Sequence, residues 1–134
     1  MQRTRDWWVQ AEADLRHARH ALEDEDFEWA CFAAQQAAEK ALEAVFEQRG
    51  QQAWGHSVTR MLQAREDQGF SIEEALLNAA KTLDKLYIPT RYPNGLAEGA
   101  PTEFFTRPEA EHAIRCAEAI LRFSHGLLAG PGSG

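Results

Sequence analysis

Several polar side chains with the chemistry to bind a ligand stand close together in an alanine-rich stretch of the chain. Gln36 lies three residues before Glu39 and four before Lys40, and these spacings bring side chains together on one face of a helix. One interpretation is a solvated helix surface, the usual role of charge on a helix. The other is a hydrogen-bonding patch beside a cleft, into which Arg91 and Tyr92 reach to hold the phosphate and base of a nucleotide.

The segment that supplies Arg91 runs from residue 87 to residue 105 and contains three prolines and two glycines, which is typical of a long irregular connection. Connections of this length are usually functional. Its aromatic residues indicate a loop that is held against the rest of the protein. For Asp84, an ion pair with Arg91 that fixes this loop is favoured over a role as a catalytic carboxylate. The residues predicted to bind a ligand are Arg91, Tyr92, Asn94, Tyr87, Asp84, Lys40 and Gln36.

The histidines form no recognisable metal cluster. His17 and His20 stand three apart, but no further ligands follow at the spacing of a metal site. We therefore interpret them as surface histidines and predict neither a metal nor a cofactor. His56 follows Gly55, and its ring nitrogens suit hydrogen bonding at a helix end as readily as proton transfer.

Apolar residues three and four apart predict five helices, over residues 4–22, 27–49, 57–67, 71–86 and 106–124. Asp26 and Ser57 are the expected N-caps of the second and third helices, and capping-box sequences at Ser71 and Thr106 open the last two. The second helix is so rich in alanine that neighbouring helices can approach it closely, which predicts that it is central. Short turns and one long loop predict an antiparallel bundle, with the tryptophans as core and interface anchors.

At 134 residues the chain has the size of one domain, which we expect over residues 1–128 with a tail at 129–134. A net charge of −7 without any run of Lys and Arg argues against broad duplex DNA binding. Lys81, Lys85, Arg91 and Arg107 still allow a small positive pocket. No stretch reaches the roughly 18 apolar residues of a membrane span and no signal peptide is recognised, so we expect a cytoplasmic protein without membrane contact.

Four stretches together resemble the prokaryotic HEPN domain family: AEADLRHA at 11–18, EWACFAAQQAAEKAL at 28–42, WGHS at 54–57 and LDKLYIPTRYPN at 83–94. In this order they cover the chain from about Trp8 to Phe123. The resemblance implies an all-α antiparallel bundle of about five helices, like nucleotidyltransferase substrate-binding domains. It also implies a homodimer, and a small nucleotidyltransferase as the partner in a toxin–antitoxin pair.

Some members of that family are metal-independent ribonucleases, which use an Arg and a His near the start of the last helix with four to six residues between them. Arg can bind the scissile phosphate while His moves the 2′-hydroxyl proton. Arg107 and His112 have this spacing, as do Arg49 and His56, whereas Arg91 has no His within that distance. About one such pair is expected by chance. The candidates for catalysis are Arg107, His112 and His56.

The first hypothesis is therefore a binding and interaction module that uses Arg91, Tyr92 and Asn94. It binds a nucleotide or RNA, partners a nucleotidyltransferase, or does both. The alternative is a metal-independent ribonuclease, with Arg91 or Arg107 on the phosphate and His112 or His56 in proton transfer. A structural oligomer without a ligand is the third hypothesis.

Overall fold

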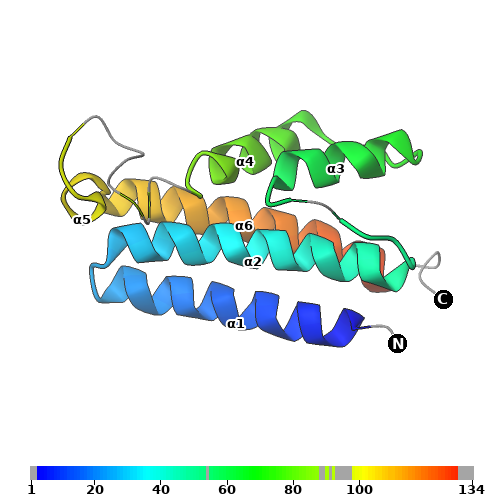
Figure 1. Cartoon of the computed structure of the whole chain (residues 1–134), viewed down its shortest axis with the longest axis horizontal. Coiled ribbons are helices and arrows are strands. Elements are labelled where there is room, and N and C mark those ends of the chain that lie inside the picture. The colour runs from blue at the N-terminus through cyan, green and yellow to red at the C-terminus, as the bar shows by residue number, and fades with distance from the viewer. Residues whose placement is uncertain (1–2, 54, 88–89, 91, 93–97, 130–134) are drawn as a thin grey trace.

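The computed structural model describes residues 3–53, 55–87, 90, 92 and 98–129, and every element in that part of the chain is a helix (Figure 1). The first two helices, α1 (Thr4–Glu23) and α2 (Phe27–Gln48), confirm the segments predicted from the apolar pattern. Asp26 is the N-cap residue of α2 as expected, although its side chain makes no capping hydrogen bond. Gly50, at φ 68°, follows the end of α2 in the left-handed conformation that glycine favours.

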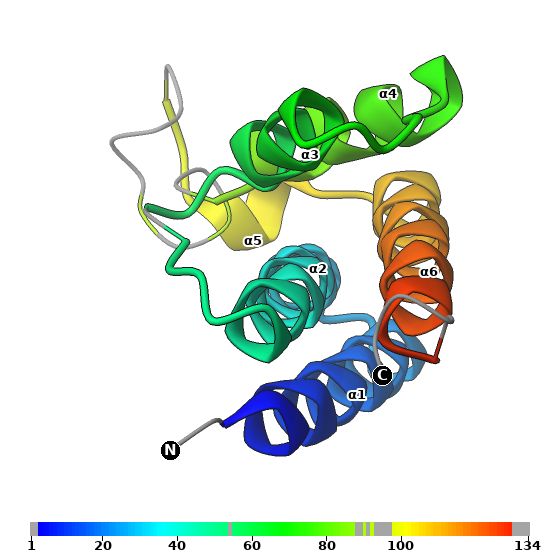
Figure 2. The same cartoon turned by 90° about the vertical axis from the view of Figure 1, so that its right-hand side faces the viewer.

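The central position predicted for α2 is confirmed, because it contacts α1, α3, α4, α5 and α6. Figure 2 looks nearly along the long helices and shows α1 and α6 packed next to α2, with α3 and α4 across it from α1. Many of its alanines are fully buried, and side chains this small let neighbouring helices pack close to its backbone. These alanines are Ala30, Ala34, Ala37, Ala38, Ala41 and Ala44.

The third helix confirms the sequence prediction, and the fourth corrects it. α3 spans Val58–Asp67, and the Ser57 side chain accepts a hydrogen bond from the Arg60 N–H as its N-cap. α4 spans Glu74–Asp84, so the capping box predicted at Ser71 is wrong. Residues 71–73 form a non-helical lead-in that places Ile72 in the core at 8% exposure, and the helix therefore begins later than predicted.

The segment predicted as an irregular connection contains one further helical turn, α5 (Pro101–Phe104), so the described residues form six helices rather than five. The last helix, α6 (Arg107–Ala129), begins at the predicted capping box. Glu109 accepts a hydrogen bond from the N–H of Thr106 at 3.0 Å, and its own N–H donates to the Thr106 hydroxyl at 3.4 Å. α1 runs antiparallel to both α2 and α6, and α4 packs on α6 (Figure 1).

A buried arginine lies where α3 ends. Arg65 is fully buried, and its guanidinium stacks on the ring of Phe70 at 4.2 Å. One nitrogen donates to the side chain of Gln68, while Nε and Nη2 have no hydrogen-bond partner. Burial, followed by repulsion from Arg49, lowers the pKa of Arg65. This site costs the fold free energy, because a buried charge is stable only when it is well paired.

Candidate ligand-binding site

Four rings follow one another along the outer surface of α2. Trp29 and Phe32, three residues apart on α2, meet edge to face with centroids 6.0 Å apart. Tyr87, which follows α4, lies 6.4 Å from Phe32. The ring of His56, in the connection before α3, stacks on Tyr87 at 4.6 Å and 18°. We call these four residues the ring row. Three separate segments therefore build one aromatic surface.

Polar side chains of α2 hold one end of the ring row in place. Glu39, which is only 9% exposed, accepts a hydrogen bond from His56 Nδ1 at 2.8 Å if that nitrogen carries the proton. Its second oxygen accepts from the amides of Gln35 and Gln36, both at 3.2 Å. Gln35 also donates to the backbone carbonyl of His56 at 3.4 Å. Both carboxylate oxygens are thus engaged, and the imidazole is oriented as it stacks on Tyr87.

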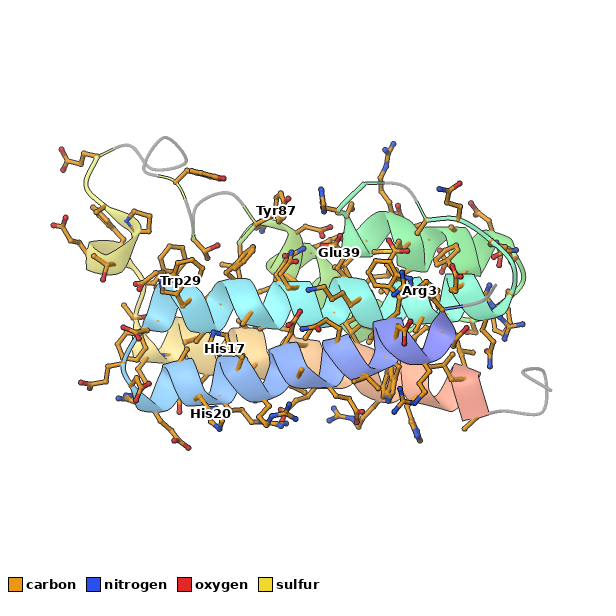
Figure 3. All side chains as sticks on the ribbon, turned by 60° about the horizontal axis from the view of Figure 1, so that its bottom comes forward. Arg3, His17, His20, Trp29, Glu39 and Tyr87 are labelled. Atoms are coloured by element: carbon orange, nitrogen blue, oxygen red, sulfur yellow. The ribbon has the colours of Figure 1, made fainter. Side chains whose placement is uncertain are left out.

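Figure 3 shows Trp29, Tyr87 and Glu39 on one side of the molecule and His17 and His20 on α1. No group of three or more His, Cys, Asp or Glu side chains that could hold a metal ion occurs in the part of the chain that the structure describes. None of the helices there is long and apolar enough to cross a membrane. What the ring row does offer is a set of stacked and edge-to-face rings, with His56 in contact with the Glu39 carboxylate.

The polar residues predicted to bind a ligand on α2, Gln36 and Lys40, take part in two different sets of contacts. Gln36 joins Glu39 in the network, as their spacing indicated. Lys40 instead forms an ion pair with Asp14 of α1, at an Nζ–Oδ2 distance of 2.5 Å. This ion pair joins α1 to one side of α2. In the structure Lys40 is therefore a link between helices.

The loop residues predicted to bind a ligand are only partly described. Tyr92 is 48% exposed, whereas Arg91 and Asn94 lie outside the described residues. Asp84 binds the start of α3, accepting from the hydroxyl of Ser57 at 2.9 Å and from the N–H groups of Val58 and Thr59 at 2.7 and 3.1 Å. Because a carboxylate at a helix N-terminus is favoured by the exposed N–H groups there, these bonds give Asp84 a structural role.

The candidates for catalysis lie in different surroundings. Arg107 pairs with Glu25 at 3.1 Å and stacks on Phe27 at 5.1 Å, so it holds the start of α6 to the turn after α1. The side chain of His112 lies next to that of Cys116, one turn further along α6, with its Nε2 3.7 Å from the sulfur. Residues five apart on a helix point about 140° away from each other. Of the three candidates, only His56 lies in the ring row.

Sequence reasoning missed Trp29 and Phe32. The tryptophans were predicted to be core and interface anchors, yet Trp29 is 50% exposed. A signal was present, because residues 29, 32, 36 and 39 follow the three- and four-residue steps of one helix face. A single sequence does not show which face of a helix its neighbours leave uncovered.

The family model of the HEPN domain matches residues 4–127. The chain belongs to the HEPN family. Its fold is similar to that of TT1696 from Thermus thermophilus, with 49% identity, a TM-score of 0.90, and coverage of 96% of this chain and 100% of that one. The archaeal HEPN homologue ST0689 is 40% identical at a TM-score of 0.79, with 94% and 98% covered. A HEPN domain protein of Thermotoga maritima, tm0613, is 42% identical at 0.75, with 92% and 98% covered. No curated protein matches the chain.

Proposed function

We propose that this HEPN chain is a binding module that holds a nucleotide, or the bases of single-stranded RNA, on the ring row. The observation that carries the proposal is the series of four rings, half-exposed at Trp29 and exposed at His56. Bases stack on protein rings largely without regard to sequence, and each stacked base contributes about 1–3 kcal/mol.

Charge gives the bound ligand a direction. Beyond the ring row the same face of α2 carries Glu39 and Glu47, whose charges repel phosphate, and Glu43, whose raised pKa of about 7 means that it adds its charge only above that pH. The phosphates therefore lie toward the other end of the row. Arg91 follows Tyr87 by four residues, and we assign it to the phosphate because a guanidinium forms paired hydrogen bonds with phosphate oxygens.

Calorimetric titration with ATP, GTP and a short single-stranded oligoribonucleotide tests this proposal. We expect saturable binding that Trp29→Ala and Tyr87→Ala each weaken about tenfold or more, as the loss of one stacking ring predicts. Arg91→Ala should weaken binding and make the affinity less sensitive to salt. Val9→Ala is the matched control, since Val9 is an apolar residue of α1 with 45% exposure outside the ring row. Equal affinity in the wild type and in both ring variants would refute the proposal.

A metal-independent ribonuclease is the second candidate function, and the contact between Glu39 and His56 favours it. A carboxylate bound to Nδ1 orients an imidazole so that its other nitrogen can accept or deliver a proton. In that case RNA is cleaved in the presence of EDTA, and cleavage is lost in His56→Ala and Arg91→Ala but retained in His20→Ala. Loss in His112→Ala, with His56→Ala active, would instead place the chemistry on α6. Binding without cleavage leaves the module as the function.

The partners implied by the family are proposals of the same kind. We propose that the chain forms a homodimer and that a small nucleotidyltransferase is its protein partner, as in a toxin–antitoxin pair. Light scattering coupled to gel filtration measures the mass of the assembly, and co-purification with a nucleotidyltransferase encoded beside this chain tests the partner. A monomer that binds neither RNA nor nucleotide and does not co-purify with the transferase would contradict the binding, homodimer and partner proposals together.

A further inference from the structure

A hollow of about 550 Å³ lies between α1 and α6, away from the ring row. The two helices are in contact and run antiparallel, as Figures 1 and 2 show. Leu15 and Leu121, both 7% exposed, line it from either side and give it an apolar floor. Volumes of roughly 300–1,000 Å³ are typical of small-molecule sites.

Two contacts between α1 and α6 mark the ends of the hollow. At one end the ring of Trp8 lies 5.7 Å from that of His125. At the other, Arg19 and Glu118 form an ion pair at 2.7 Å. Trp8 and Arg19 are eleven residues apart on α1, which corresponds to about 16 Å. A partner helix laid along this groove would have to cross both contacts, whereas a compact ligand fits between them.

The charges of the hollow favour an anion. Three arginines and two glutamates line it, an excess of one positive charge on a chain whose net charge is −7. Arg19 is neutralised by Glu118. Arg16 and Arg122 are exposed on opposite helices, and neither has an ion-pair partner in the described part of the chain. Guanidinium groups without a partner are suited to paired hydrogen bonds with a phosphate or carboxylate.

From this arrangement we infer that the hollow between α1 and α6 is a second binding site, which takes a compact oxyanion carried on a flat apolar ring. The anion binds to Arg16 and Arg122 above the two leucines. The ring of the ligand packs against Trp8, the best aromatic surface of the hollow. The site is independent of the ring row, because it shares no residue with it.

Three probes with one ring system separate the contributions: 1-naphthyl phosphate, 1-naphthoate and the neutral 1-naphthalenemethanol. We expect both anions to bind saturably, and their relative affinity shows whether phosphate or carboxylate is preferred. Arg16→Gln and Arg122→Gln should each weaken binding of the anions about tenfold, the loss typical of one charge-assisted contact, and leave the neutral probe unchanged. Trp8→Leu should weaken all three.

Arg115→Gln is the matched control, since Arg115 is an exposed arginine of α6 that does not line the hollow. Thermal unfolding confirms that each variant is folded. Tyr87→Ala should leave the affinity for these probes unchanged, which separates this site from the ring row and from the proposed function. Failure of the anions to saturate, or an equal loss of affinity in Arg115→Gln, would overturn the inference. So would unaltered binding in Arg16→Gln and Arg122→Gln.

Discussion

Glu43 is expected to destabilise the protein in a way that depends on pH. It lies on α2 one turn from Glu39 and one turn from Glu47. Burial, followed by repulsion from these two carboxylates, raises the pKa of Glu43 from 4.5 to about 7, against the opposing effect of His56. Between these pH values the folded protein keeps Glu43 protonated while the unfolded chain ionises it. The free energy of unfolding therefore falls as the pH rises through this range.

The magnitude follows from the pKa. A rise from 4.5 to about 7 corresponds to a penalty on the ionised form of at most about 3 kcal/mol. Glu43 is only partly buried, and screening by solvent reduces this penalty to about 1–2 kcal/mol. Glu43→Gln removes the charge and keeps the shape. It should therefore raise the free energy of unfolding by about 1–2 kcal/mol at pH 8 and by much less at pH 5.

Thermal unfolding followed by circular dichroism at pH 5 and pH 8 measures this difference. For a chain of this size the gain at pH 8 corresponds to a rise in Tm of roughly 3–8 °C. Glu66→Gln is the matched control, because Glu66 is an exposed carboxylate of α3. It should leave Tm nearly unchanged at both pH values. A gain from Glu43→Gln that is the same at pH 5 and pH 8 would show that repulsion and burial of charge are not its cause.

Substitutions at three further positions test helix capping and charge burial by denaturant unfolding. Asp84→Ala removes the acceptor of three hydrogen bonds from the start of α3 and should cost about 2 kcal/mol, whereas a change below about 0.5 kcal/mol would contradict that role. Thr106→Ala should cost about 1 kcal/mol through loss of the α6 capping box, and Thr106→Ser should restore most of it. Arg65→Met replaces a buried cation with unpaired nitrogens and should be neutral or stabilising by about 1 kcal/mol, so a loss above about 2 kcal/mol would show that the charge is needed.

The sequence predicted the helices because their apolar periodicity and caps are local signals. Ser57 and Thr106 lie at the predicted caps, and α2 is central as its alanines indicated. The prediction failed where tertiary packing outweighed a local signal. Ser71 begins a good capping-box sequence, but Ile72 is drawn into the core and α4 starts two residues later than that box implies. The turn of α5 was also missed, because a four-residue helix has no periodicity to detect.

The candidate site was predicted only in part, because its contacts join residues far apart in the sequence. Gln36 and Glu39 were found together from their spacing on one helix. The stacking of Tyr87 on His56 brings together residues 31 positions apart, and no local pattern predicts such a contact. The exposure of Trp29 likewise depends on which face of α2 its neighbours leave uncovered. Arg91 and Asn94 remain predictions from the sequence.

The division of α2 into two surfaces links the fold to the proposed function. Its alanines lie on a buried side, whereas Trp29 on the opposite side is half-exposed. Along that side aromatic rings come first and carboxylates follow, with Glu39 at the boundary and in contact with His56. Under the proposed function, a ligand with a flat, uncharged end and an anionic end is expected to bind in one orientation, because reversing it would bring the anion to Glu47 and, above a pH of about 7, to ionised Glu43. The proposal therefore assigns the acidic half of the helix a role in specificity through repulsion, without contact with the ligand.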